Sequence, residues 1–131
     1  MTQVHPTVRE FLTRQGLPIE PRADGRIVLT IDQRYRIACT PAAGDLLLET
    51  RIGNLPLDAK RKDEVIDRIM QLSGSRLNEH ADGPVLQDDQ STVALQRHVP
   101  RTVTLFEFER ALGEFANGAA YWKSAMKGEL E

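Results

Sequence analysis

The sequence predicts an α+β domain with the element order αβββαββα, in which helices flank an antiparallel sheet. Two observations support this fold class. Between Arg26 and Ile52, polar and apolar residues alternate in three short stretches that are joined by tight turns. From Leu105 to Met126, apolar residues recur at helical spacings of three and four. We expect residues 1–131 to form a single domain, because that length suits one hydrophobic core.

The N-terminal element is predicted to be a helix from about Pro6 to Gln15. Its apolar stripe consists of Val4, Val8, Phe11 and Leu12. Proline fits only the first turn of a helix, and Gly16 is a suitable residue just after its end. Residues 17–20 could form a short strand that joins the meander through Asp24-Gly25, although Pro21 disfavours this hairpin.

The three alternating stretches predict a meander of strands, over residues 26–32, 35–40 and 46–52. Residues at every second position share one face of a sheet, which places Ile27, Leu29 and Ile31 together. The connections at 32–34 and 41–44 are too short for the crossover that parallel neighbours require. The strands should therefore be antiparallel, with their apolar face covered by helices.

A second helix is predicted after the loop at 53–56. Asp58 could cap its start. However, three cations at 60–62 would oppose the helix dipole in a first turn, which favours a start nearer Asp63. Ser73-Gly74-Ser75 should end the helix. Its apolar stripe is wider than one sheet contact needs, so we expect a dimer interface there, formed by Val65, Ile66, Ile69, Met70 and Val85.

A second pair of strands is predicted at 84–86 and 92–99, with a turn at 88–91 between them. Val93, Leu95 and Val99 should share one face of the sheet. Arg97 interrupts their alternation.

The C-terminal stripe predicts one long amphipathic helix that lies across the sheet. Thr104 and Glu107 have the spacing of a capping box at its start. An intermolecular coiled coil is the alternative interpretation. The stripe is too short for the several heptads that a coiled coil needs, which favours the single helix.

The composition indicates a cytoplasmic protein. The formal net charge is −2, and a single cysteine cannot form an internal disulfide, which fits a reducing compartment. No apolar run is long enough to span a membrane, and the N-terminus lacks the pattern of a secretory signal. Neither half of the chain is basic enough to indicate a nucleic-acid partner.

Four arginines lie close together in the sequence: Arg22, Arg26, Arg34 and Arg36. They form either the solvated face and turns of the first hairpin or a patch for an acidic partner.

No motif in the sequence indicates catalysis, a metal or a cofactor. Phosphate-binding loops, paired cysteines and closely spaced histidines are all missing, so we expect no catalytic residues, no metal ligands and no cofactor. Cys39 alternates with Ile37 and fits a small core residue better than a nucleophile. The alternative function is a small enzyme or regulatory domain with a site near Arg34, Arg36 and His98.

Several stretches of the chain resemble the class I type III secretion chaperones of the Tir-chaperone type. The resemblance follows the element order and covers nearly the whole chain. The matching stretches are Phe11-Leu12-x-x-x-Gly16-Leu17, Ile27–Asp32, Gly53–Pro56, Gly83–Leu86, Thr92–Leu95, and Leu112-x-x-Phe115 with Trp122.

This resemblance implies a homodimer that binds the N-terminal segment of a secreted effector. The segment would stay extended and soluble, partly by adding a strand to a sheet edge. The residues that correspond to the family's hydrophobic patches are Phe11, Leu12, Leu17, Ile27 and Leu29. We also expect Val4 and Val8 to extend this apolar patch towards the N-terminus, beyond what the sheet needs for cover.

Overall fold

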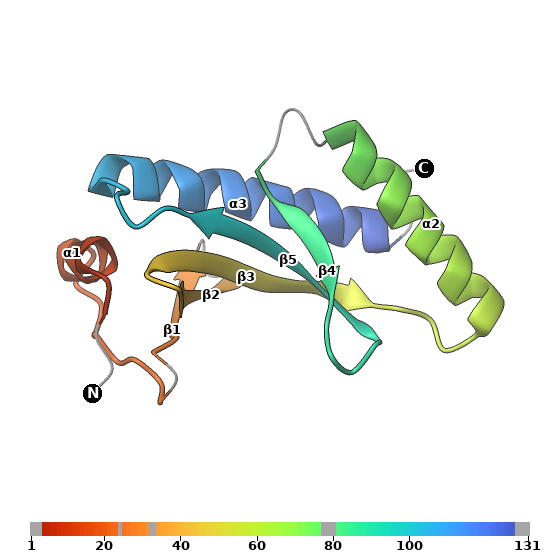
Figure 1. Ribbon diagram of the computed structural model, residues 1–131, viewed down its shortest axis with the longest axis horizontal. Coiled ribbons are helices and arrows are strands. Elements are labelled where there is room, and N and C mark those ends of the chain that lie inside the picture. Colours follow the sequence, from red (N-terminus) through yellow and green to blue (C-terminus); the bar gives the residue numbers. More distant parts are fainter. Residues whose placement is uncertain (1–3, 24, 32–33, 77–80, 128–131) are drawn as a thin grey trace.

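The computed structural model describes residues 4–23, 25–31, 34–76 and 81–127, and it has the predicted order αβββαββα (Figure 1). The elements are α1 (Pro6–Arg14), β1 (Ile27–Ile31), β2 (Tyr35–Ala42), β3 (Asp45–Asn54), α2 (Ala59–Arg76), β4 (Gly83–Leu86), β5 (Thr92–Val99) and α3 (Leu105–Met126). The connection between α2 and β4 lies partly outside the described residues.

The five strands form one antiparallel sheet in the order β1-β2-β3-β5-β4. The predicted meander and the second strand pair are both confirmed. The predicted short strand at 17–20 is wrong, because this segment is irregular in the structure. Pro18 and Pro21 lack the N–H groups that a strand ladder needs. The sheet therefore ends at β1 on one side and at β4 on the other.

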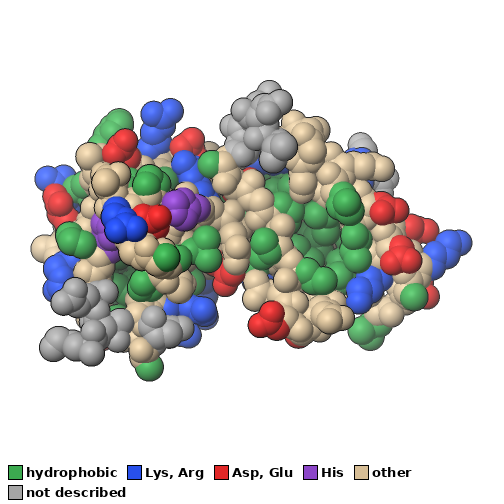
Figure 2. All heavy atoms as spheres, viewed as in Figure 1, with side chains coloured by type: hydrophobic (Ala, Val, Ile, Leu, Met, Phe, Trp, Pro, Cys, Tyr) green, Lys and Arg blue, Asp and Glu red, His purple; other side chains and the backbone are tan. Residues whose placement is uncertain are grey.

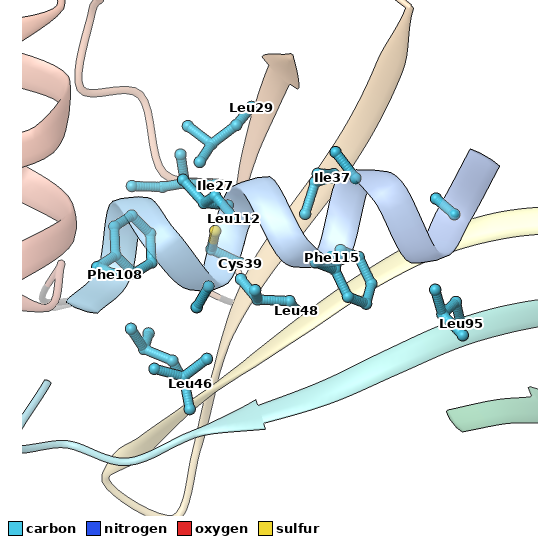
Figure 3. Close-up of a cluster of buried hydrophobic side chains, with 14 of the residues drawn as sticks. Ile27, Leu29, Ile37, Cys39, Leu46, Leu48, Leu95, Phe108, Leu112 and Phe115 are labelled. Carbon is cyan, nitrogen blue, oxygen red and sulfur yellow. The ribbon is translucent and has the colours of Figure 1, made fainter. Parts of the chain in front are cut away.

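The core lies between α3 and one face of the sheet (Figure 3). Phe108, Leu112 and Phe115 of α3 are buried against alternate residues of the strands. Those residues are Ile27, Leu29, Ile37, Cys39, Leu46, Leu48 and Leu95. Full burial of a large apolar side chain contributes about 1.5–3 kcal/mol, so this layer supplies most of the drive to fold.

The helix α1 packs beside the N-terminal end of α3. The ring of Phe11 meets the ring of Phe108 edge to face, with centroids 5.5 Å apart. As predicted, Gly16 follows the end of α1, with a φ of 68° that glycine adopts without strain. The N–H of Leu17 then donates to the carbonyl of Leu12 at 2.9 Å, which turns the chain away from the helix.

The helix α2 begins at Ala59, directly after Asp58. The Asp58 carboxylate accepts from the N–H of Arg61 at 3.0 Å, so the predicted later start near Asp63 is wrong. The cap satisfies an N–H that would otherwise lack a partner, and this outweighs the cations of the first turn. The predicted stop at 73–75 is also wrong, since the helix runs through to Arg76. A helical glycine costs only about 1 kcal/mol and Gly74 has open space around it.

The helix α3 runs unbroken over 22 residues, as the stripe predicts. The predicted capping box is present, because Thr104 and Glu107 each accept from the other's N–H. Arg97 lies on the covered face of the sheet and reaches Glu114 of α3 at 3.5 Å. This ion pair explains how a charged residue interrupts an otherwise apolar face.

Gly118 of α3 allows a close approach of the α2–β4 connection. A Cβ atom at this position would collide with the carboxylate of Asp82. The Asp82 side chain is almost fully buried, and it lies 3.7 Å from the guanidinium of Arg76. Arg76 in turn stacks on the ring of Tyr121 at 4.0 Å. The end of α2 is therefore fixed to α3 at a point where only glycine fits.

We predict opposite effects of the same substitution at two glycines of α3. Gly118→Ala should destabilise the protein by about 1–3 kcal/mol, because it displaces a buried carboxylate. Gly113→Ala is the matched control, since it meets no neighbouring atom and should stabilise the helix by about 1 kcal/mol. Urea denaturation followed by circular dichroism measures both. Equal stability of the two variants would contradict the packing described here.

Candidate functional site

A hollow of about 300 Å³ runs along the free edge of β1. Its walls are the irregular segment from Leu17 to Arg22 and the residues of β1 from Ile27 to Thr30. Four of the five residues that the family resemblance indicates for effector binding line it, namely Leu12, Leu17, Ile27 and Leu29. Phe11 is not among the lining residues. The hollow thus brings apolar side chains, together with the polar ones of Glu20, Arg22 and Thr30, next to a strand edge that has no neighbouring strand within the described part of the chain.

The five predicted residues differ in their exposure. Phe11, Leu12, Ile27 and Leu29 are buried in the core, whereas the side chain of Leu17 is 42% exposed. Val4 and Val8 are also buried, so the expectation that they extend an exposed patch is wrong. They pack into the same core as α3. Leu17 supplies the exposed apolar surface of this hollow, and the buried residues shape the wall behind it.

A second, apolar hollow of about 130 Å³ lies between α2 and β4. Figure 2 shows hydrophobic side chains gathered in this region. Four of the five predicted dimer residues line it: Ile66, Ile69, Met70 and Val85. Val65 is half-buried and, like Ile66 and Ile69, packs against the core, but it does not line this hollow. Leu55 and Leu86 also line this hollow, and sequence reasoning missed them. Their apolar character next to predicted turns is the signal in the sequence that could have indicated them.

The α2–β4 surface leaves apolar side chains exposed. Met70 is 66% exposed and Leu86 is 49% exposed. No residue of α2 that the structure describes is fully buried, although the helix has 18 residues. Exposed apolar area of this kind marks a contact surface or an aggregation hazard.

The face of the sheet away from α3 carries a wide polar hollow of about 730 Å³. Arg22, Arg36 and Arg51 contribute to its lining. Two of its three acidic residues have hydrogen-bond partners. Glu49 accepts from the side-chain amide of Gln96 at 2.6 Å. The hydroxyl and N–H of Thr92, with the N–H of Ser91, lower the pKa of Asp89 to about 2.

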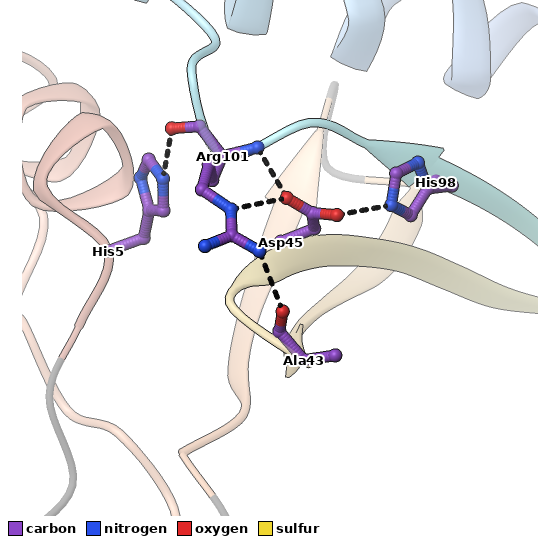
Figure 4. A network of polar contacts seen from close by, with 5 residues as sticks. All are labelled: His5, Ala43, Asp45, His98 and Arg101. Atoms are coloured by element: carbon purple, nitrogen blue, oxygen red, sulfur yellow. Dashed lines mark hydrogen bonds and ion pairs between the residues drawn. The ribbon is translucent and has the colours of Figure 1, made fainter.

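A polar network joins the β2–β3 turn, β5, the loop before α3 and the start of α1 (Figure 4). The Asp45 carboxylate accepts from the N–H of Arg101 at 2.8 Å and contacts the ring of His98 at 2.9 Å. The Arg101 guanidinium donates to the carbonyl of Ala43, and the Arg101 carbonyl contacts the ring of His5 at 2.9 Å. The Arg101 N–H, followed by His98, lowers the pKa of Asp45. This network stabilises the position of α1 relative to the sheet.

The structure does not bring together the residues of the alternative enzyme site. Arg34 lies over the ring of Tyr35, and Arg36 is opposite Thr30 near the β1 edge. His98 of β5 is opposite Leu47 of β3, and Leu47 is in turn opposite Thr40 of β2. Arg36 is four residues from Thr40, so it lies about 13 Å along β2 from the position nearest His98. Burial raises the pKa of Cys39 to about 12, which keeps this thiol neutral in the core.

The described part of the chain shows no group of three residues that could hold a metal ion. Nor does it include a helix with the length and apolar character needed to cross a membrane.

The fold and the order of its elements are those of the type III secretion chaperones. Residues 7–123 match the model of the Tir chaperone protein (CesT) family, and the chain belongs to this family. The family is one of chaperones rather than enzymes. A comparison with curated proteins finds no match.

Three solved structures illustrate the likeness. The ExsC–ExsE complex has a TM-score of 0.73 at 18% identity, over 96% of this chain and 97% of that chain. The Yersinia pestis secretion chaperone SycH with a fragment of YscM2 scores 0.63 at 19% identity, over 90% and 98%. The ExoU–SpcU complex from Pseudomonas aeruginosa scores 0.67 at 15% identity, over 87% and 93%. At these identities the likeness concerns the fold alone.

We predict that Asp45→Asn lowers stability at neutral pH and flattens its dependence on pH in acid. The pKa of Asp45 is lower in the folded state, so its contribution is complete above about pH 4 and is lost as the pH falls through the folded pKa. Melting temperatures measured from pH 2 to pH 7 should therefore converge in acid. Asp88→Asn is the control, because this exposed turn residue has no hydrogen bond from its side chain within the described chain. A constant difference between wild type and Asp45→Asn at every pH would contradict this prediction.

Proposed function

We propose that this protein is a cytoplasmic type III secretion chaperone, acting as one domain over residues 1–131. It binds the N-terminal segment of a secreted effector and keeps that segment extended, soluble and competent for secretion. The observation that carries the proposal is the hollow along the edge of β1, where the exposed side chain of Leu17 lies beside a strand edge that has no neighbouring strand among the described residues. Family membership supports the same conclusion.

The mechanism uses the free backbone groups of β1. An extended segment that lies beside Ile27–Ile31 can form strand hydrogen bonds with this edge, whatever its sequence. Alternate side chains of the segment then enter the hollow beside Leu17, which gives apolar residues an advantage. A segment bound as an added strand cannot pair with another chain or collapse on its own apolar residues.

The same proposal assigns the α2–β4 surface to a homodimer contact. β1 and β4 are at opposite edges of the sheet, so a partner at β4 leaves the β1 hollow open. The exposed Met70 and Leu86 would be covered by the second copy. The solved structures described above support the partner class, since one holds SycH with a fragment of YscM2 and another pairs ExoU with SpcU.

We expect Leu17→Asp to abolish effector binding without unfolding the protein. Leu17 is exposed, so a charge there costs little stability but places a carboxylate among the apolar side chains of the β1 hollow. Affinity for the N-terminal segment of the effector should fall at least about 30-fold, as for an interface anchor. Calorimetric titration with N-terminal segments of the host's secreted proteins, tested singly, measures this.

Leu12→Ala is the matched comparison, because Leu12 lines the same hollow but is buried. It should cost about 2–5 kcal/mol of stability and alter affinity less than Leu17→Asp. Normal effector binding by a folded Leu17→Asp variant would show that the β1 hollow is not the effector site.

The double variant Met70→Glu, Leu86→Glu should be monomeric and folded. Both side chains are exposed in one copy, and charges on the two facing surfaces would repel and remain unpaired. Light scattering after gel filtration gives the mass directly. Phe106→Glu is the control, since Phe106 is 74% exposed but lies at the opposite end of α3 from α2 (Figure 1). Loss of the dimer in the control as well, or its survival in the double variant, would refute the assignment.

A further inference from the structure

We propose that the β1 edge selects an effector segment in which acidic residues alternate with apolar ones. The apolar residues enter the hollow beside Leu17, and the carboxylates pair with Arg22 and Arg36 on the other side of the sheet. This inference rests on the proposed function, because it concerns the segment bound at β1. It adds the chemical class of that segment.

Two hollows meet at the β1 edge. The hollow beside Leu17 and the hollow of the open sheet face share two lining residues, Arg22 and Val28. A strand added to β1 would therefore have one hollow on each side. Because successive side chains of a strand point to opposite faces, every second residue would enter the hollow beside Leu17 and the others would face the arginines.

The side chains of β1 leave the arginines within reach of an added strand. Val28 and Thr30, which face the open side, are both short, and Thr30 is directly opposite Arg36 on β2. A residue added beside Thr30 would lie two strand spacings from Arg36, or about 10 Å between backbones. An extended arginine and a glutamate can span this distance between them. Arg22 lies near the other end of β1, since its N–H donates to the carbonyl of Arg26.

Both arginines can form ion pairs with carboxylates of a bound segment. Arg22 and Arg36 are exposed, and neither forms an ion pair within the described residues. Arg51 lines the same hollow and adds to the positive field. Three acids line the same hollow: Glu49, Asp88 and Asp89. Glu49 of β3 is opposite Ala38, two residues from Arg36 on the same face of β2, but its carboxylate accepts from the side-chain amides of Gln87 and Gln96. Asp88 and Asp89 lie in the β4–β5 turn, where the Asp89 carboxylate accepts from Ser91 and Thr92. On the apolar side, Glu20 is the acid among the lining residues, and it would disfavour carboxylates there.

The arrangement favours a short acidic peptide over a nucleic acid. The net charge of the chain is −2, so a long polyanion would be repelled by much of the surface. Arg22 lies beside Arg26 and Arg36 lies opposite Thr30, so the two arginines are about 13 Å apart along β1 and match carboxylates four residues apart in an extended segment.

The test uses three synthetic ten-residue peptides with the same alternating leucines and isoleucines. Their intervening positions are all Glu, all Gln or all Lys. Fluorescence anisotropy at low salt should show that the Glu peptide binds the wild-type chain about tenfold more tightly than the Gln peptide, as expected for two exposed ion pairs. The Lys peptide should bind most weakly. The preference for Glu should shrink at 0.5 M salt, a concentration set for the assay at which the screening length is only about 4 Å.

The variants locate the effect. Arg22→Gln with Arg36→Gln should remove most of the Glu preference, measured as the ratio of the affinities for the Glu and Gln peptides. Arg110→Gln is the control, because Arg110 is an exposed arginine of α3, in the layer on the covered side of the sheet. Melting curves establish that each variant is folded. Arg36→Glu should bring the affinities for the Glu and Lys peptides together or reverse their order.

The outcomes separate this inference from the proposed function. Equal binding of the Glu and Gln peptides, both lost in Leu17→Asp, would refute the acidic preference and support the β1 hollow as the binding site. Failure of all three peptides to bind would refute both. If a 15-mer of thymidine bound as tightly as the Glu peptide and displaced it, the arginines would serve polyanions in general, and the inference would be wrong.

Discussion

The packing of α3 on one face of the sheet is the contact on which the rest of the structure depends. Its buried residues recur every three or four positions and cover alternate residues of four strands. Because strand residues alternate between faces, the register that buries Leu48 also places Leu47 and Glu49 on the open face. One helix thus decides which face of the sheet is core, which face meets solvent, and where the polar hollow lies. The single-residue slip that would exchange these faces is excluded by the burial of Phe108, Phe115 and Trp122.

The other two helices differ in how deeply their residues are buried. α1 covers the end of the core near Phe108 and buries Val8, Phe11 and Leu12. α2 has twice as many residues, yet none that the structure describes is fully buried. Both helices are amphipathic, so the difference lies in what is available to cover them. The sheet and α3 leave less apolar area for α2, so Val65, Ile66, Ile69 and Leu72 pack against the core but are only partly buried.

Sequence reasoning predicted the elements wherever local chemistry decides them. Alternation revealed the strands because one face of the sheet is covered and the other is open. The capping box at Thr104 and the glycine after α1 are signals within a few residues. The errors arose where two local effects compete, as at the start of α2, where the Asp58 cap outweighs the cations that follow it. The turn-like sequence Ser73-Gly74-Ser75 led to the wrong end for α2. Gly74 lowers the stability of the helix but does not end it.

The candidate site was harder to predict, because exposure depends on contacts between distant segments. Leu12 and Leu17 look equivalent in the sequence, but the turn at Gly16 directs the chain away from α1, and the two leucines differ in burial. The arginine cluster was visible as a group, but only the sheet register separates Arg36 at the β1 edge from Arg34 beside Tyr35. Leu55 and Leu86 could not be assigned, because they are about 30 residues apart in the sequence and meet only in the folded chain.

The sheet order also sets the length of the segment that the proposed dimer can hold. β1 and β4 are separated by four strand spacings, about 19 Å, so two copies joined near β4 would hold their β1 edges about 40 Å apart. An extended chain advances about 3.3 Å per residue, and a segment must therefore exceed about a dozen residues to reach both edges. A symmetric interface makes the two edges identical, but a single chain meets them in opposite order along its sequence. A segment that occupied both edges would need two different stretches, each able to bind in the hollow beside one β1 edge. A shorter segment would occupy one edge and leave the other free for a second molecule.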